Sequence, residues 1–89
     1  MPTFTIDGRV FTVGFDYRGR YDGQRLTFAE ISVNGEPFAA GSTRVSSRDT
    51  FVRRTGRRIA LARALQHGGF SREQRRSIWQ QLFAQGLRR

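Results

Sequence analysis

Two dipeptides, Asp7-Gly8 and Asn34-Gly35, constrain the fold of this chain more than any other feature. Both favour the tight two-residue turn that joins antiparallel strands, because Asp, Asn and Gly tolerate positive φ angles. Each pair lies between segments in which apolar residues alternate with polar ones, as in half-buried strands. The first half of the chain is therefore predicted to form two antiparallel hairpins.

The two turns also predict the strand registers, because a two-residue loop determines which residues face each other. The predicted pairs are Ile6 with Arg9, Phe4 with Phe11, Val33 with Glu36, Ile31 with Phe38, and Ala29 with Ala40. Leu26 and Phe28 have the opposite parity to Ile31. We expect either a bulge near Glu30 or a strand covered on both faces.

The apolar pattern changes to a helical period in the second half of the chain. Ser46, Ser47 and Asp49 are candidate N-caps for a helix from Thr50 to about Gln66, which Gly68-Gly69 ends. The predicted buried stripe of this helix consists of Phe51, Thr55, Ile59, Ala62 and Leu65, flanked by Val52 and Leu61. We expect this stripe to face the sheet.

A capping box, Ser71-Arg72-Glu73-Gln74, predicts the start of a second helix. Its apolar stripe consists of Ile78, Trp79, Leu82 and Phe83, and Trp79 is interpreted as a core residue. Gly86 suits the position just after the helix, which leaves a short tail. The predicted fold is α+β: two antiparallel hairpins form one sheet (1–46), and two helices with a tail (47–89) pack on one face, giving a single ββββαα domain.

The composition excludes some classes of site and of location. The chain has no cysteine, so it can form neither disulfides nor thiolate metal sites. It has no apolar run of about twenty residues, and Met1–Phe4 does not follow the pattern of a signal segment. We expect a soluble cytoplasmic protein that contacts no membrane.

Charge is distributed unequally between the two halves. The net charge is +9, and all sixteen basic residues are arginine. Residues 1–47 contain five arginines and five acids, whereas residues 48–89 contain eleven arginines and two acids. Arginine binds phosphate well because its guanidinium donates several hydrogen bonds, and the same group stacks on bases because it is planar. The segregation indicates a binding face for a polyanion, such as nucleic acid or a nucleoprotein.

The helical period predicts which arginines form this face. Arg53 and Arg57 lie opposite the predicted apolar stripe, with Arg54 at its margin, and together they would form a basic ridge. Arg58 falls on the apolar side, where a half-buried structural arginine is the favoured interpretation and a binding role the alternative. Arg72, Arg75 and Arg76 lie at the start of the second helix, where positive charge opposes the helix dipole. Such a conflict often marks a functional site.

The segment Tyr17–Arg25 is predicted to be a polar loop between the hairpins. It combines arginine and glycine with two tyrosines, as in proteins that bind single strands or RNA. A solvated loop whose tyrosines fold back on the sheet is the alternative. The predicted partner-binding residues are therefore Arg53, Arg54, Arg57, Arg72, Arg75 and Arg76 from the helices, and Arg18, Arg20, Tyr17 and Tyr21 from the loop.

Catalytic constellations are weak in this sequence. The single histidine, His67, precedes two glycines at a predicted helix end, where it would lie beside the last carbonyls. No Ser/His/Asp set or carboxylate pair is recognisable. We therefore predict a non-enzymatic protein without cofactor, metal or small-molecule substrate, and a nuclease with His67 or Asp49 as general base is the alternative.

The C-terminal half follows a pattern that resembles a known group. Asp49–Leu65 matches D-x-F-x-R-x-x-G-R-x-I-A-L-x-R-A-L, and Arg75–Trp79 matches R-x-x-I-W. This half resembles small proteins of bacteriophages and mobile elements. The resemblance implies an anti-CRISPR-like inhibitor, which docks its basic helical face on a host defence nucleoprotein and blocks access of nucleic acid. The alternative is a DNA- or RNA-binding module that uses the same arginines on phosphates.

Overall fold

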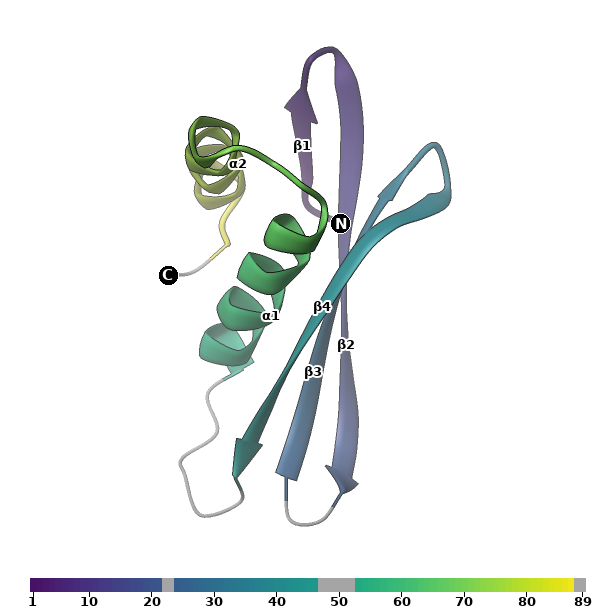
Figure 1. Ribbon diagram of the computed structural model, residues 1–89. Helices are drawn as coiled ribbons and strands as arrows, with labels where there is room; N and C mark the ends of the chain where they lie inside the picture. The colour runs from purple at the N-terminus through teal and green to yellow at the C-terminus, as the bar shows by residue number, and fades with distance from the viewer. Residues whose placement is uncertain (22–23, 47–52, 88–89) are drawn as a thin grey trace.

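The computed structural model describes residues 1–21, 24–46 and 53–87, and at 18–21, 24–25, 45–46 and 53–54 it describes the backbone alone. The elements are β1 (Thr3–Ile6), β2 (Arg9–Tyr21), β3 (Gln24–Val33), β4 (Glu36–Ser46), α1 (Arg53–His67) and α2 (Arg72–Ala84). The strands form one antiparallel sheet in the order β1-β2-β3-β4, and both helices lie on one face of it (Figure 1). The predicted ββββαα arrangement is confirmed.

Both predicted two-residue turns are present. Asp7 and Asn34 have φ angles of 52° and 53°, and the glycine that follows each has a φ of 77°. Positive φ at both central positions matches the right-handed twist of the flanking strands. Ile6 pairs with Arg9, Phe4 with Phe11, and Val33 with Glu36, as predicted.

The predicted polar loop Tyr17–Arg25 is wrong over its described part. Residues 17–21 continue β2, and residues 24–25 begin β3. The two strands pair from Phe11 opposite Val33 to Tyr21 opposite Gln24. The central hairpin is therefore much longer than its glycine and arginine content indicated, because ladder hydrogen bonds to a neighbouring strand outweigh local propensity.

The second hairpin has a register shift between Ile31 and Ser32, close to Glu30, but the extra residue is on β4 and not on β3. Ile31 pairs with Ala39 and Ala29 with Gly41, one residue beyond the predicted partners, and Ser32 pairs with Pro37. Phe38 is thus the extra residue of a bulge beside Pro37, which has no N–H to donate. The Phe38 ring contacts Phe11 and Phe70, at centroid distances of 5.1 and 5.7 Å.

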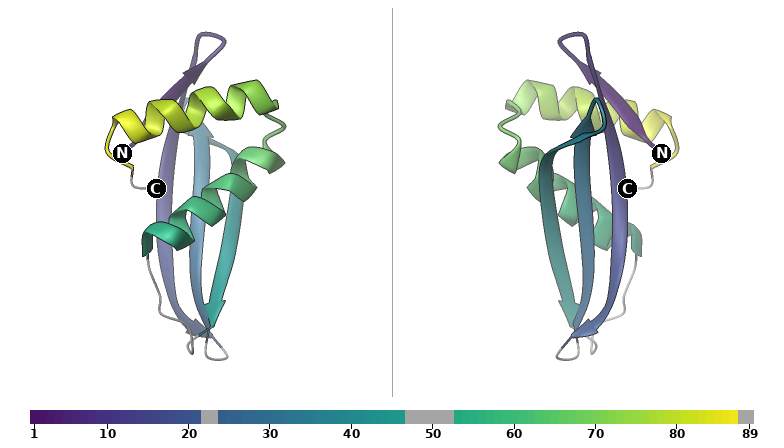
Figure 2. Two further views of the ribbon diagram at one scale, coloured as in Figure 1. Left: turned by 90° about the vertical axis from the view of Figure 1, so that its left-hand side faces the viewer. Right: turned by 90° about the vertical axis from the view of Figure 1, so that its right-hand side faces the viewer.

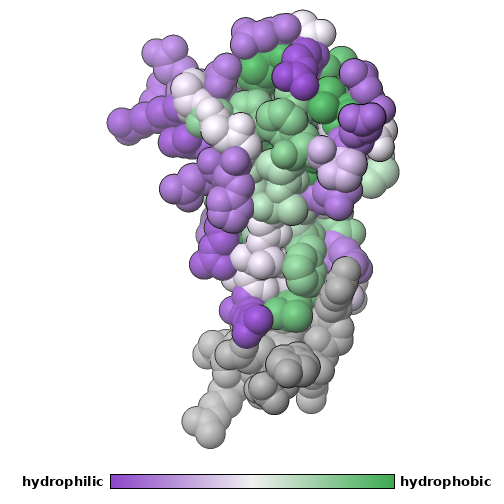
Figure 3. All heavy atoms as spheres, turned by 45° about the vertical axis from the view of Figure 1, so that its right-hand side comes forward, coloured by the Kyte–Doolittle hydropathy of each residue, from purple (hydrophilic) through white to green (hydrophobic). Residues whose placement is uncertain are grey.

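The opposite parity of Leu26 and Phe28 reflects apolar residues on both faces of β3, because β3 has no extra residue near Glu30. Thr27, Ala29 and Ile31 are buried, whereas Leu26 and Phe28 are half-buried. Since successive side chains point to opposite faces, Leu26 and Phe28 lie on the face away from the helices. Figure 3 shows an apolar band, bordered by hydrophilic residues, along the side of the molecule that it brings forward.

Helix α1 approaches the sheet closely through small residues. Its buried face contains Gly56, Ala60 and Ala64, spaced four residues apart, together with Leu61 and Leu65. A Cβ atom at Gly41 of β4 would overlap the α1 backbone at Ala60 and Ala64. The helix axis can lie this near the strand because no side chain stands between the two backbones.

Helix α2 covers the edge of the sheet at β1. Gln81 and Gln85 lie one turn apart, and Thr5 and Thr3 lie two residues apart on the strand, which are similar rises. The backbone N–H of Thr5 donates to Gln81 (2.8 Å), and Gln81 donates to the Thr5 carbonyl (3.0 Å). Gln85 makes the same pair of bonds with Thr3, accepting from its N–H at 2.9 Å. These bonds satisfy an exposed strand edge.

The helix ends follow the sequence signals within the described residues. The capping box of Ser71 and Gln74 is present, with bonds of 2.8 and 3.1 Å. Gly69 and Gly86, just after the two helices, have φ angles of 77° and 99°. Ser46 ends β4 instead of capping α1, and the other proposed caps, Ser47 and Asp49, lie outside the described residues, as do Thr50, Phe51 and Val52.

Candidate functional site

Helix α1 is rotated relative to the predicted orientation, and this changes which arginines are exposed. Thr55 and Ala62, which were assigned to the buried stripe, are exposed, and Ile59 is half-buried. The face that packs on the sheet instead contains the small residues Gly56, Ala60 and Ala64, of which the two alanines lie against Gly41. Hydropathy alone did not distinguish the two stripes, because alanine occurs on both sides of the helix: Ala60 and Ala64 are buried, and Ala62 is exposed.

Arg57 packs against the sheet and is not part of an exposed ridge. Its side chain is half-buried, and its guanidinium carbon lies 5.9 Å from the ring centroid of Phe15. Its Nε atom is buried and has no hydrogen-bond partner among the described residues. Arg57 therefore has the structural role that the sequence pattern assigned to Arg58.

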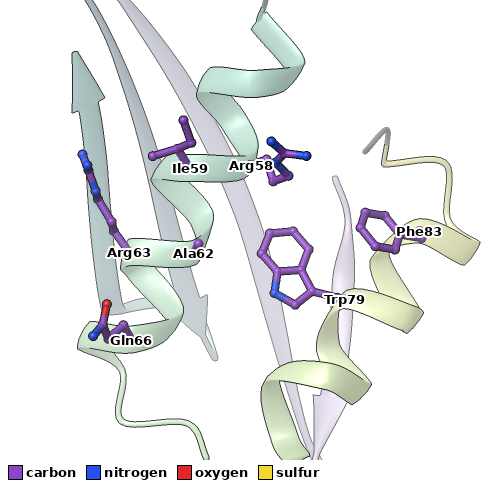
Figure 4. A pocket seen from close by; sticks show the side chains of 7 residues that line it. All are labelled: Arg58, Ile59, Ala62, Arg63, Gln66, Trp79 and Phe83. Atoms are coloured by element: carbon purple, nitrogen blue, oxygen red, sulfur yellow. The ribbon is translucent and has the colours of Figure 1, made fainter. Parts of the chain in front are cut away.

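Arg58 is exposed and lies at an open pocket between the two helices. The cavity has a volume of about 480 Å³. Its lining consists of Arg58, Ile59, Ala62, Arg63 and Gln66 from α1, and Trp79 and Phe83 from α2. In Figure 4 the two aromatic side chains extend from α2 toward α1, and Arg58 lies beside them. The favoured interpretation of Arg58 as half-buried is wrong, since the rotation of α1 turns it outward.

Trp79 and Phe83 form the aromatic wall of this pocket. Their ring centroids lie 5.7 Å apart with an interplanar angle of 27°, which is a stacked arrangement. Both side chains are half-buried. Trp79 packs against the core at one side, so the predicted core role is correct only in part. The remaining surface of the rings faces the space between the helices.

Arg63 and His67 attach α1 to the edge strand β4. Arg63 donates to the carbonyl of Ser42 (2.7 Å), and Nδ1 of His67 lies 2.7 Å from the carbonyl oxygen of Ala40. Because a carbonyl only accepts, Nδ1 carries the proton in this contact. His67 therefore bonds to a carbonyl of the sheet. The sequence pattern had predicted that it would lie beside the last carbonyls of its own helix. Arg63 keeps further N–H donors on an exposed side chain.

The three arginines at the start of α2 are not equivalent. Arg75 is half-buried and donates to the carbonyl of Phe70 at 2.6 Å. Arg72 and Arg76 are exposed. Of the predicted cluster, Arg75 has a structural partner and two arginines face solvent.

The remaining predicted residues lie at the other end of the molecule. Arg18, Arg20 and Tyr21 belong to the last part of β2, and Tyr17 is a half-buried strand residue opposite Thr27. Both views in Figure 2 place this end of the sheet far from α2. The side chains of Arg18, Arg20, Tyr21, Arg53 and Arg54 lie outside the described part of the structure. The proposed combination of these residues with the α2 arginines is therefore not a single cluster.

The sequence pattern gave Arg58 a binding role only as the alternative, and it missed Arg63, Trp79 and Phe83 as site residues. Two signals pointed to them: Gly56, Ala60 and Ala64 recur at four-residue spacing, and this small-residue line places Arg58 on the outer side. A Trp and a Phe four residues apart share one helix face. In the described part of the chain, no group of three His, Asp or Glu residues could hold a metal ion, and no helix is long and apolar enough to cross a membrane.

Comparison of the chain with protein-family models, with curated proteins and with solved structures finds no match. The residues and their geometry are therefore the basis for a functional proposal.

Proposed function

We propose that this protein binds nucleic acid through its two helices, without catalysing a reaction. The observation that carries the proposal is the charge of the helical layer. Helix α1 contains five arginines and α2 contains three, and Glu73 is the one acid in the two helices. Arg58, Arg63, Arg72 and Arg76 are exposed. A surface with this excess of guanidinium groups attracts a phosphate backbone by releasing its condensed counterions.

The chemistry of the exposed groups favours nucleic acid over a polyanion without bases. The same layer that carries the arginines also carries the half-buried rings of Trp79 and Phe83. Arginine binds phosphate, and aromatic rings stack on bases, which is the usual pairing in proteins that bind single strands. The proposed contacts are Arg58, Arg63, Arg72 and Arg76 with phosphates.

The salt dependence of binding tests this proposal. We would measure fluorescence anisotropy of labelled single-stranded DNA, double-stranded DNA and RNA against the protein across a salt series. The expected result is micromolar or tighter binding near physiological salt, with a slope that corresponds to several phosphates. Binding that disappears at physiological salt for all three nucleic acids would overturn the proposal.

A charge reversal identifies the face. Arg58→Glu should weaken binding by about tenfold and lower the salt slope by roughly one phosphate. Arg44→Glu is the matched control, because Arg44 is also exposed but lies on β4 and not on the helices. Equal losses for the two variants would indicate attraction by net charge and not by the helical layer.

A second candidate function is inhibition of a host defence nucleoprotein. The resemblance of Asp49–Leu65 and Arg75–Trp79 to phage and mobile-element proteins favours it. The helical layer would then dock on a complex such as a CRISPR effector and block its nucleic-acid channel. Binding to the purified effector complex far tighter than to free nucleic acid, with competition by target DNA, would support this function. A protein that binds free oligonucleotides but not the complex would contradict it.

A further inference from the structure

The pocket between α1 and α2 combines three features that select a kind of ligand. Its volume of about 480 Å³ lies within the range of small-ligand sites, roughly 300 to 1,000 Å³. Ile59 and Ala62 contribute an apolar surface, opposite the aromatic wall of Trp79 and Phe83 (Figure 4). Arg58, which also lines the cavity, supplies positive charge beside the rings. A flat ring next to an anionic group fits this combination.

We propose that this pocket receives an unpaired nucleobase, which stacks on Trp79 while Arg58 contacts the adjoining phosphate. The inference rests on the proposed nucleic-acid binding and adds a preference for single strands. A base in a duplex has its faces covered by neighbouring bases and does not reach the pocket. Stacking on a ring does not distinguish one sequence from another, because every base has a π-face.

The packing of the helices keeps the pocket open. Ala62 is an exposed alanine at the middle of α1, so no long side chain fills the space before Trp79. Arg63 donates to the carbonyl of Ser42, which holds its guanidinium toward β4 and away from the rings. Helix α2 is held by its glutamines at the β1 edge, and the two helices make little contact with each other. The cavity therefore results from how each helix is attached to the sheet.

Trp79 is the only tryptophan of the chain, so the tryptophan fluorescence of the protein reports on this pocket. We would titrate the protein with a short single-stranded oligothymidine, an abasic oligonucleotide of equal length and charge, and a duplex. Tryptophan emission and anisotropy of labelled strands would be followed together. The base-containing single strand should quench Trp79 and bind about tenfold tighter than the abasic strand, since base–aromatic stacking is lost in the latter.

The outcomes separate this inference from the proposed function. Equal affinity of the abasic and base-containing strands, without quenching, would overturn base insertion and leave polyanion binding intact. Failure of every oligonucleotide to bind would overturn both, and would favour a protein partner for the helical layer.

A pair of variants tests the pocket without removing a charge or an aromatic ring. Ala62→Leu fills the cavity from α1, whereas Ala84→Leu adds the same side chain at an exposed position of α2 that does not line it. Ala62→Leu should abolish the preference for bases and the quenching, while affinity for the abasic strand persists. Ala84→Leu should behave as the parent. Retention of the base preference in folded Ala62→Leu protein, checked by circular dichroism, would contradict the proposed pocket.

Discussion

The two helices cover the same sheet by different means. Helix α1 lies on the sheet through backbone proximity, with Gly41 beneath Ala60 and Ala64. Helix α2 meets the edge strand β1 through the side-chain amides of Gln81 and Gln85, which bond to the strand backbone. The first contact depends on the absence of side-chain atoms, and the second depends on two particular side chains.

This difference explains why the helical layer has an open pocket. Each helix has its own attachment to the sheet, and the buried residues of both helices belong to one core cluster. Ile78 and Leu82 of α2 are buried, and so are Leu61 and Leu65 of α1. Trp79 and Phe83 remain half-buried between the helices, with Arg58 beside them. The proposed binding surface and the core are thus different sides of the same two helices.

The largest effect is expected from Gly41→Ala, which tests the close contact of α1. Its Cβ would meet helix backbone, which cannot move without shifting α1, so we expect a loss of about 3 kcal/mol of folding free energy. Gly14→Ala is the control, because a Cβ there meets only the terminal methyl of Met1. Thermal and urea unfolding would measure the free energy of unfolding of both variants. Equal stability of the two variants would show that α1 does not need this contact.

Replacement of both Gln81 and Gln85 by leucine tests the attachment of α2. The variant loses the four bonds to Thr3 and Thr5, and we expect a destabilisation of about 2 kcal/mol. Amide hydrogen exchange should become faster at Thr3 and Thr5, whose N–H groups lose their acceptors. Gln80→Leu, at an exposed position of the same helix, is the control. Unchanged exchange at the β1 edge in the double variant would argue against the glutamine contacts.

The smallest effect on stability is expected at the neighbouring residues Arg57 and Arg58. The two should differ in whether their loss affects stability or binding. Arg57→Ala removes packing on Phe15 and should cost about 1 kcal/mol, while binding of nucleic acid is retained. Arg58→Ala should change stability by less than about 0.5 kcal/mol and weaken binding. Unfolding curves and anisotropy on the same preparations give both quantities. The reverse ranking would place Arg57 in the binding site and return Arg58 to a structural role.

Local signals predicted much of the fold. The turns at Asp7-Gly8 and Asn34-Gly35, the capping box at Ser71 and the glycine at position 86 lie where the pattern placed them. Each depends on the conformational preference of a few adjacent residues. The candidate site was predicted less well, because Arg57 and Arg58 exchanged roles when α1 packed with its small-residue face toward the sheet.

By itself, the sequence determined the order of strands and helices, the positions of most turns and the segregation of arginine into the second half. These properties depend on backbone preference and on residue identity, which need no partner in space. Only the tertiary structure decided the rotation of α1, the bulge at Phe38 and the two glutamines at the β1 edge. Their physical reason is contact between segments far apart in the chain, such as Gly41 with Ala60. The same contacts leave Arg58, Trp79 and Phe83 around one pocket.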